Sequence, residues 1–314
     1  MLAVDDILVA RDFSSVSDRA LRHGLSLAAR TGATLHVLHA EVLHDLGEDD
    51  RPSPGNGIDT ARDELARAGA ASAEALEGVS VVEVTRRDVS PAPAVLRYAH
   101  EKDIDLIALG THGRRGPSRV LLGSVAEEVV RRADAPVLTV RGEEEGGRAT
   151  PVGLLDRILV PVDFSAPSRE ALRVAAAWAD LYGARIDTLH VVEEDLHPAF
   201  YVGGVRSVYD VEPDLDEKVE AKLRDFASDT MGSADGVDAH VRTGSAPSEI
   251  AEFVETNGVD LVALSTHGRT GLERFLLGSV TEKVVRHARC PVLTVKAFGR
   301  TLLSPDSTAT STSA

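Results

Sequence analysis

Three glycines and a serine stand at fixed distances in the first half of the chain, in the pattern G-x2-G-x9-G-S. They are Gly110, Gly113, Gly123 and Ser124. The pattern follows a short apolar run at 106–109 and precedes a stretch of helical spacing at 125–132. Glycine lets backbone amides approach a ligand without a Cβ in the way, and a helix N-terminus favours an anion. This placement predicts a phosphate-binding loop, although the same glycines would also serve tight turns and close helix packing.

The spacing differs from the familiar phosphate-binding motifs. No Gly-Lys-Ser or Gly-Lys-Thr follows, as a Walker A loop requires, and the dinucleotide pattern G-x-G-x-x-G does not occur here. Ser124 stands where the helix should begin, so we expect its hydroxyl to cap that helix.

The chain repeats itself. Residues 105–140 and 260–295 are identical at 25 of 36 aligned positions, and residues 7–14 and 158–165 share the form Ile-Leu-Val-x-x-Asp-Phe-Ser. The repeated unit of about 140 residues has the size of a whole domain. We therefore expect domains at 1–142 and 156–297, a linker at 143–155 and a tail without structure at 298–314. The second copy of the glycine pattern reads Ser265, Gly268, Gly278 and Ser279.

Short apolar runs alternate with helical patterns in both halves, which predicts an α/β fold in which each domain has a doubly wound, five-stranded parallel sheet. The expected strands are 7–10, 35–40, 79–84, 106–109 and 137–140, then 158–161, 186–192, 237–241, 261–264 and 292–295. Helical patterns lie around 20–29, 65–76, 95–99 and 125–132, and again at 168–181. Because the runs are continuously apolar, we expect strands buried on both faces.

Asp12 and Asp163 end the first strand of each half. In a doubly wound sheet, strand one lies at the switch point, where its carboxyl end faces a ligand bound against strand four. Both residues also precede a helix, so the alternative is a capping role, which Ser14 or Ser165 could equally fill.

Composition limits the classes of partner. The formal net charge is −16, from 50 acidic and 34 basic residues, which argues against a protein that tracks a nucleic-acid backbone. Apolar runs stay shorter than the roughly 18–20 residues of a membrane span. The single cysteine, Cys290, precedes an apolar run, where we expect it to pack as a small hydrophobe. One cysteine allows no disulfide within the chain, so we expect a cytoplasmic protein.

The motifs together resemble the universal stress protein (UspA) family, and the chain is similar to a tandem member of its ATP-binding branch. The resemblance covers nearly all of residues 4–296 and implies a fold related to the adenine nucleotide alpha hydrolases. It also implies that the domains pair through their last strands, here 137–140 and 292–295, as an intramolecular pseudo-dimer that could associate further into a homodimer.

The resemblance implies an adenine nucleotide site in each half. In the first half it would comprise Ala10, Asp12, Ala40, Leu109, Gly110, Gly113, Arg114, Gly123, Ser124 and Val125. In the second half it would comprise Pro161, Asp163, Val191, Leu264, Ser265, Gly268, Arg269, Gly278, Ser279 and Val280. In the first half, Ala10 and Ala40 would contact the base, Leu109 and Gly110 would lie near the ribose, and Gly113, Gly123, Ser124 and Val125 would contact the phosphates. The ligand would be ATP or a related adenine nucleotide with bound Mg2+. No residue of the protein is assigned as a ligand of this metal.

Each half departs from the family pattern. Ala10 and Ala40 replace the larger Pro and Val that members often carry, which reduces contact with the base. Ser265 replaces the first glycine, and its Cβ would crowd the site if the backbone there needed an unusual angle.

Histidines and arginines flank the loop in both halves. His112 and His267 recur in Thr-His-Gly-Arg and could relay a proton, but no nucleophile or carboxylate pair accompanies them in sequence, so a loop or phosphate contact is the favoured role. Arg114 and Arg269 suit phosphate, or are simply solvated. His39 and His190 end the second strands, where we expect packing residues with a satisfied ring nitrogen.

Three functions remain open on these residues. The first is a stress-response sensor or signalling module that binds nucleotide and alters its affinity for an unidentified protein partner. The second is a slow ATPase or autophosphorylating enzyme with Ser124 or Ser279 as acceptor; no catalytic residues are assigned, because the chain lacks a catalytic Lys and an Asp cluster of the Walker B kind. The third is an adaptor pseudo-dimer with vestigial sites.

Overall fold

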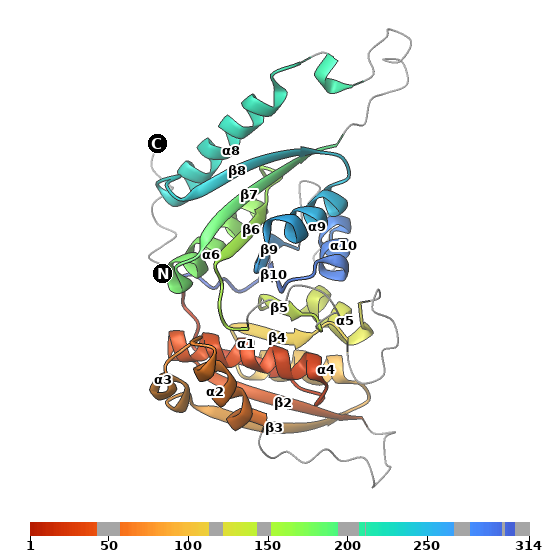
Figure 1. The fold of residues 1–314 in the computed structure, drawn as a ribbon. Coiled ribbons are helices and arrows are strands. Elements are labelled where there is room, and N and C mark those ends of the chain that lie inside the picture. The colour runs from red at the N-terminus through yellow and green to blue at the C-terminus, as the bar shows by residue number, and fades with distance from the viewer. Residues whose placement is uncertain are drawn as a thin grey trace.

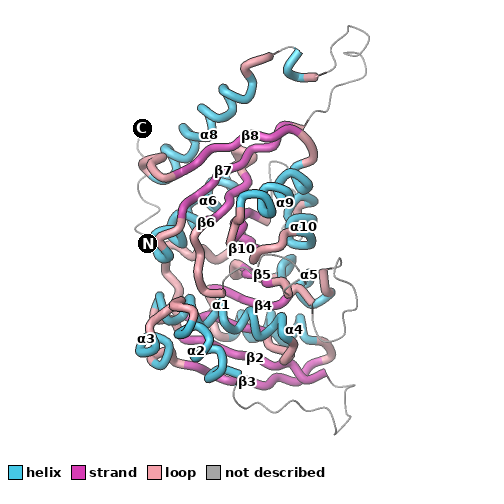
Figure 2. The backbone as a smooth tube through the Cα atoms, in the orientation of Figure 1, coloured by secondary structure: helices cyan, strands magenta, loops and turns pink. Residues whose placement is uncertain are grey.

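The computed structural model describes residues 1–42, 57–112, 122–142, 152–193, 207–210, 212–266, 277–296 and 299–304. Strands and helices alternate along both halves (Figure 1; Figure 2). The first half contains the strands β1 (Asp6–Ala10), β2 (Thr34–Val42), β3 (Val81–Asp88), β4 (Leu106–Gly110) and β5 (Val137–Val140) and the helices α1 (Ser15–Thr31), α2 (Gly57–Arg67), α3 (Ala73–Glu77), α4 (Pro91–Glu101) and α5 (Ser124–Arg132).

The second half repeats this architecture, with one long helix, α8, in the place that α2 and α3 occupy in the first half. Its strands are β6 (Arg157–Pro161), β7 (Arg185–Val192), β8 (Val237–Thr243), β9 (Leu261–Ser265) and β10 (Val292–Val295). Its helices are α6 (Ala166–Tyr182), the short 3-10 turn η2 (Val208–Asp210), α8 (Leu215–Met231), α9 (Ala246–Asn257) and α10 (Ser279–His287).

All ten strands form one sheet in the order β3-β2-β1-β4-β5-β10-β9-β6-β7-β8. Neighbours within each half are parallel, and β1 lies between β2 and β4, which is the switch point expected of a doubly wound sheet. The halves join where β10 pairs with β5 in antiparallel register, Leu293 opposite Leu138. The expected α/β fold and the expected pairing through the last strands are therefore present.

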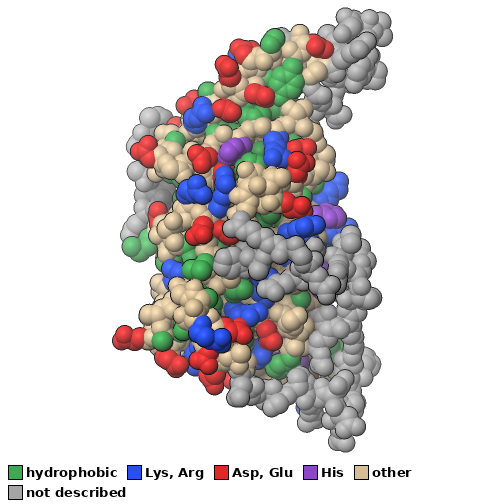
Figure 3. Space-filling view, in the orientation of Figure 1, with side chains coloured by type: hydrophobic (Ala, Val, Ile, Leu, Met, Phe, Trp, Pro, Cys, Tyr) green, Lys and Arg blue, Asp and Glu red, His purple; other side chains and the backbone are tan. Residues whose placement is uncertain are grey.

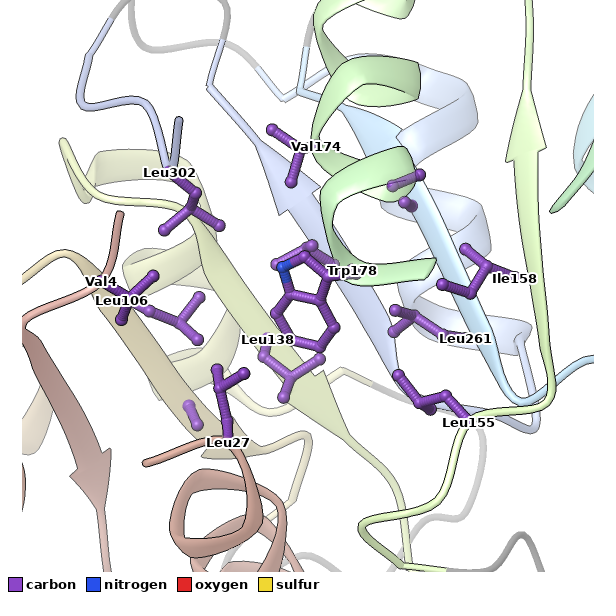
Figure 4. Packing of buried hydrophobic residues seen from close by; sticks show 14 of the residues in the cluster. Val4, Leu27, Leu106, Leu138, Leu155, Ile158, Val174, Trp178, Leu261 and Leu302 are labelled. Atoms are coloured by element: carbon purple, nitrogen blue, oxygen red, sulfur yellow. The ribbon is translucent and has the colours of Figure 1, made fainter. Parts of the chain in front are cut away.

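The helices form two layers, one on each face of the sheet. A first cluster of buried apolar residues lies under α1, α2, α3, α6 and α8, and a second lies under α4, α5, α9 and α10. Each cluster draws residues from both halves. Figure 4 shows Trp178 of α6 among side chains from both halves, including Leu27, Leu138 and Leu261. The hydrophobic core therefore continues across the junction between the halves.

Two expectations about the elements need correction. The outermost strands β3 and β8 are largely half-buried or exposed, because each is an edge strand with a neighbour on one side only. The helical stretch expected at 65–76 divides into α2 and α3 because Gly69 adopts a left-handed φ of 71° and Ser72 caps a new helix by accepting from the N–H of Ala75.

One face of α1 packs against the second half. Ser26 donates its hydroxyl hydrogen to the carbonyl of Gly153 (3.1 Å), which belongs to the last residues of the expected linker. One turn further along the helix, the Arg30 guanidinium reaches the carbonyl of Leu181 (3.5 Å) and lies 4.4 Å from the ring centroid of Tyr182. These contacts fix the orientation of the two helices that flank the junction.

Residues 299–304 return to the first half, which corrects the expectation that the chain lacks structure from residue 298. The N–H of Ala3 donates to the carbonyl of Leu302 (2.7 Å), and Leu2 forms an antiparallel bridge with Leu303. Leu302 is fully buried in the first cluster. Arg300 pairs with Asp103 and Asp105. This segment, which we call the C-terminal strap, therefore ties the second half to the start of the first.

The described surface is of mixed charge. On the face drawn in Figure 3, acidic and basic side chains are interspersed and do not form a basic track. Among the described residues, no helix is long and apolar enough to cross a membrane.

The strap leads to a stability prediction. We expect Leu302→Ala to lower the free energy of unfolding by about 2–5 kcal/mol, because it removes a buried side chain from a packed cluster. Urea unfolding, followed by the fluorescence of Trp178 in the same cluster, measures this loss. The matched control is Thr301→Ala at the exposed neighbouring position, which should change stability by under about 1 kcal/mol. Equal unfolding midpoints for the two variants would contradict a strap that anchors the chain.

A second prediction concerns acid stability. His23 is buried on α1, its Nε2 has no hydrogen-bond partner among the described residues, and burial followed by the charges of Arg19 and Arg22 lowers its pKa to about 3. The unfolded chain therefore takes up this proton first, and stability is lost as the pH falls below about 6.5. Position 174 of the second half carries Val at the matching place in α6.

We therefore expect His23→Val to remove part of the acid sensitivity. Between pH 7.5 and 5, wild type should lose about 2 kcal/mol more unfolding free energy than the variant. Urea titrations of both proteins at the two pH values give the difference, in which the other titrating groups cancel. Parallel losses in the two proteins would show that His23 is not the acid-sensitive group.

Candidate functional site

The predicted site residues gather at the carboxyl ends of neighbouring strands. Ala10 at the end of β1 lies opposite Leu109 in β4, so Asp12 and Gly110 follow at the same edge of the sheet. In the second half, β6 pairs with β9 in the same parallel sense and brings Asp163 near the end of β9. Each half therefore has a strand-one carboxylate beside the start of its glycine loop.

Several predicted residues line the second cluster near this edge. Leu109 and Leu264 are buried members of it, and Ala10, Val125, Val191 and Val280 pack against it while remaining partly exposed. Ala40 and Pro161 are half-buried. Gly113, Arg114, Gly268, Arg269 and His267 lie outside the described residues.

The turn after β1 has a tight hydrogen-bond network. Oδ1 of Asp12 accepts from the N–H of Ser14 (3.0 Å) and from its hydroxyl (2.6 Å). Ser14 in turn caps α1, since its Oγ accepts from the N–H of Ser17 (3.2 Å). Asp12 therefore supports the cap and Ser14 forms it, which resolves the alternative left open by the sequence and fixes the position of the carboxylate.

The second half repeats this network atom for atom. Oδ1 of Asp163 accepts from the N–H (3.0 Å) and hydroxyl (2.5 Å) of Ser165, and Ser165 caps α6 through the N–H of Ser168. Between the aspartate and serine, Phe13 and Phe164 adopt left-handed φ values of 62° and 63°. Such a conformation costs a bulky residue roughly 1–3 kcal/mol, and it persists only where the surroundings impose it.

Residue types alone do not reveal this strained backbone, but the repeated Asp-Phe-Ser is a signal that could have found it. Each phenyl ring packs on a histidine within the second strand of its half, near its end, with 4.8 Å between the centroids of Phe13 and His39 and between those of Phe164 and His190. Nδ1 of each histidine donates to the carbonyl of the residue after strand one, at 2.9 Å in the first half and 2.7 Å in the second. The predicted packing role of the two histidines is confirmed.

The two ends of each glycine loop are held together by backbone hydrogen bonds. In the first half, the N–H of Thr111 donates to the carbonyl of Val140 (2.8 Å), and the N–H of Gly123 donates to the carbonyl of Thr111 (2.8 Å). In the second half, Thr266 and Gly278 make the corresponding bonds at 2.9 Å. The loop therefore leaves and re-enters the sheet edge at one fixed point in each half.

Gly123 and Gly278 themselves cap the helices that follow. Both have extended backbone, and neither Ser124 nor Ser279 caps the helix, since each is its first residue. The expected capping role of Ser124 is therefore wrong. Both serines are exposed at the helix N-terminus, where the first N–H groups have no intrahelical partner. The geometry presents N–H groups and a hydroxyl to the space beside the aspartate.

The first glycine of the pattern serves close packing. A Cβ at Gly110 would lie 2.8 Å from Cγ1 of Val16 in α1. The second half has Ser265 here, and Pro167 takes the place of Val16. Neither Gly110 nor Ser265 is among the described residues with positive φ, so the unusual backbone angle that would have made Ser265 crowd the site is not present. Thr281 donates its hydroxyl hydrogen to the carbonyl of Ser265 (2.7 Å), which adds a tie that Ala126 cannot make in the first half.

His112 begins the first loop and is half-buried, with Nδ1 3.1 Å from Oγ1 of Thr111. Burial, and then the nearby charge of Arg141, lower its pKa. The ring is therefore neutral at pH 7 and can offer a hydrogen bond to a ligand but no positive charge. Among the described residues, no group of three His, Cys, Asp or Glu could hold a metal ion.

The family model for universal stress proteins matches residues 4–141 and matches again over residues 155–296. The chain belongs to the universal stress protein family. Both matches contain an Asp-Phe-Ser turn and a glycine loop of the kind described above.

Individual relatives agree with this assignment. A universal stress protein of Methanocaldococcus jannaschii is 36% identical over 145 residues, which span 46% of this chain and 83% of the relative. One of Mycobacterium tuberculosis is 27% identical over 299 residues, 92% of this chain and 96% of the relative. The crystal structure of a putative universal stress protein from Pseudomonas aeruginosa covers 94% of each chain with a TM-score of 0.62 at 20% identity, which supports the tandem fold.

The two capping glycines make a matched prediction. A Cβ at Gly123 would lie 2.9 Å from the carbonyl oxygen of Thr111, whereas one at Gly278 would lie 3.2 Å from that of Thr266. Backbone atoms cannot move aside as a flexible side chain can, so Gly123→Ala should destabilise the protein by about 1–3 kcal/mol and Gly278→Ala by less. Urea unfolding of both variants tests the order. A larger loss in the second half than in the first would contradict it.

Proposed function

We propose that this universal stress protein is a stress-response sensor or signalling module that binds ATP or a related adenine nucleotide in each half. In this proposal it acts in the cytoplasm. The nucleotide phosphates occupy the space beside the N-terminus of α5 in the first half and of α10 in the second. The bound state then alters the affinity of the protein for a protein partner.

One observation carries this proposal: both halves place a fixed carboxylate, a pinned glycine loop and an open helix N-terminus at one edge of the sheet. The carboxylates are 151 residues apart in sequence, yet they make the same two bonds to a serine. Exposed Ser124 and Ser279 stand where an anion meets the positive end of a helix. The resemblance to the ATP-binding branch of the family supports adenine as the base.

We further propose that the protein binds nucleotide without fast turnover. Oδ1 of each aspartate already accepts two hydrogen bonds from the serine that caps the next helix, so this oxygen is engaged in the turn. Mg2+ would arrive with the phosphates and neutralise part of their charge, and the aspartate carboxylates are the nearby oxygens that could orient its bound water.

The test uses a charge at the helix N-terminus. Ser124→Asp and Ser279→Asp should leave the helices intact, because an acidic residue in the first turn favours a helix, but repel phosphate. We expect each variant to weaken ATP binding by its own half at least about tenfold, or 1.4 kcal/mol. Ser124→Ala and Ser279→Ala are the matched controls, which should bind within about threefold of wild type. Titration calorimetry with Mg2+ and ATP measures both sites.

The outcomes separate the competing functions. Two sites lost one at a time would support the proposal and show which half binds more tightly. No nucleotide in the purified protein and no heat at millimolar ATP would overturn it in favour of an adaptor with vestigial sites. Steady phosphate release, or phosphate on Ser124 or Ser279, that is lost in the alanine controls would favour the slow enzyme.

A further inference from the structure

The residue after the last strand of each half is basic and reaches into the opposite half. Lys296 follows β10, and its Nζ donates to the carbonyl of Val130 in α5. Arg141 follows β5, and its Nη1 donates to the carbonyl of Ala288, the C-cap of α10, at 3.4 Å. The two contacts are reciprocal, because the antiparallel pairing of β5 with β10 brings the end of each strand beside the last helix of the other half.

Both cations contact the C-terminal end of a helix whose N-terminal end lies in a nucleotide site. Helices α5 and α10 have nine residues each. The contacted carbonyl of Val130 lies about 9 Å along the helix from Ser124, and that of Ala288 lies about 14 Å from Ser279. A cation at this end interacts favourably with the helix dipole and satisfies a carbonyl that has no intrahelical partner. Because a helix this short moves as a rod, fixing its C-terminus also fixes the position of its N-terminus.

Burial makes the Lys296 contact a strong constraint. The side chain is 8% exposed, and burial lowers its pKa to about 8, with the Asp134 carboxylate acting in the opposite direction. It is therefore still a cation at pH 7. A buried ammonium needs its hydrogen-bond partners, so the Val130 carbonyl cannot move away without a cost.

The end of each last strand also holds the glycine loop of its own half, through a backbone hydrogen bond. Val140, next to Arg141, accepts the hydrogen bond from Thr111 that starts the first glycine loop, and Val295, next to Lys296, accepts the one from Thr266. The end of each last strand therefore contacts two elements. Its backbone holds the glycine loop of its own half, and the basic side chain that follows it holds α5 or α10 of the other half.

We propose that Lys296 and Arg141 are crossed positioning residues: each holds the phosphate-binding helix of the opposite half in place and so couples the two nucleotide sites. The proposal rests on the proposed function. It requires that loss of Lys296, in the second half, weakens binding in the first half, and that loss of Arg141 weakens binding in the second.

The test isolates one site at a time. In the Ser279→Asp background the first site is the tighter one, and there Lys296→Met should raise its Kd for ATP about fivefold or more. In the Ser124→Asp background the second site is the tighter one, and the same substitution should change its Kd by less than about twofold. Arg141→Met should weaken the second site about fivefold or more, and by more than it weakens the first, where its charge lies near His112. Lys296→Arg and Arg141→Lys retain the cation and should restore at least half of the lost affinity on a logarithmic scale.

Hydrogen exchange tests the anchors without nucleotide. Lys296→Met should speed amide exchange in α5 and leave α10 unchanged, and Arg141→Met should do the reverse. If the substitutions speed amide exchange but leave every Kd for ATP unchanged, the two residues are merely structural and the proposed coupling is overturned. A loss confined to the mutated half or equal in both halves would overturn it too. If wild type binds no ATP, the proposed function fails and the coupling fails with it, whereas wild-type binding without the crossed pattern overturns this inference alone.

Discussion

The antiparallel pairing of β5 with β10 is the interaction on which the rest of the molecule depends. Both four-residue strands are fully buried, and Thr139 and Thr294 each donate a side-chain hydrogen bond across the junction, at 3.2 and 3.1 Å. An unpaired β5 would expose an apolar edge with free N–H and C=O groups, which is an aggregation hazard. Pairing the two edges makes one sheet, and both hydrophobic clusters can then run from one half into the other.

The two halves share one fold, but their buried polar side chains differ. Asp6, His36 and Tyr98 form a hydrogen-bonded row in the first half, with both of its bonds at 2.8 Å. In the second half, Asp187 takes the place of His36 and pairs with Arg157 and His240. Burial acts to raise the pKa of Asp187, but the bonds from Arg157 and His240 outweigh it and lower the pKa to about 2. The Asp187 carboxylate is buried, so the second half could not lose Arg157 alone without leaving that charge poorly paired.

Periodicity predicted the parts of the fold that depend on burial. The strands near the switch point follow apolar runs such as 106–109 and 137–140 within a residue or so, because a strand covered on both faces must be apolar throughout. The pairing of the last strands came from the family resemblance, since two equivalent apolar runs do not reveal their partner. Edge exposure of β3, the strap around Leu302 and the left-handed Phe13 all depend on tertiary neighbours, which local patterns do not encode.

The glycine pattern predicted correctly that a loop leaves the fourth strand and leads into a helix, but not the physical reason for each glycine. Gly110 makes room for Val16, and Gly123 makes room for a carbonyl of the loop base, so steric closeness requires both even if no phosphate binds. The second half has Ser265 at the position of Gly110 and Pro167 at the position of Val16, so a Cβ is tolerated there. A glycine motif therefore reports the close approach of chain segments, and nucleotide binding follows only if the space those segments enclose is open to an anion. The repeated aspartate turn makes the same point, because the strained backbone at Phe13 and Phe164 lets each phenyl ring pack on a histidine, a contact that glycine could not make.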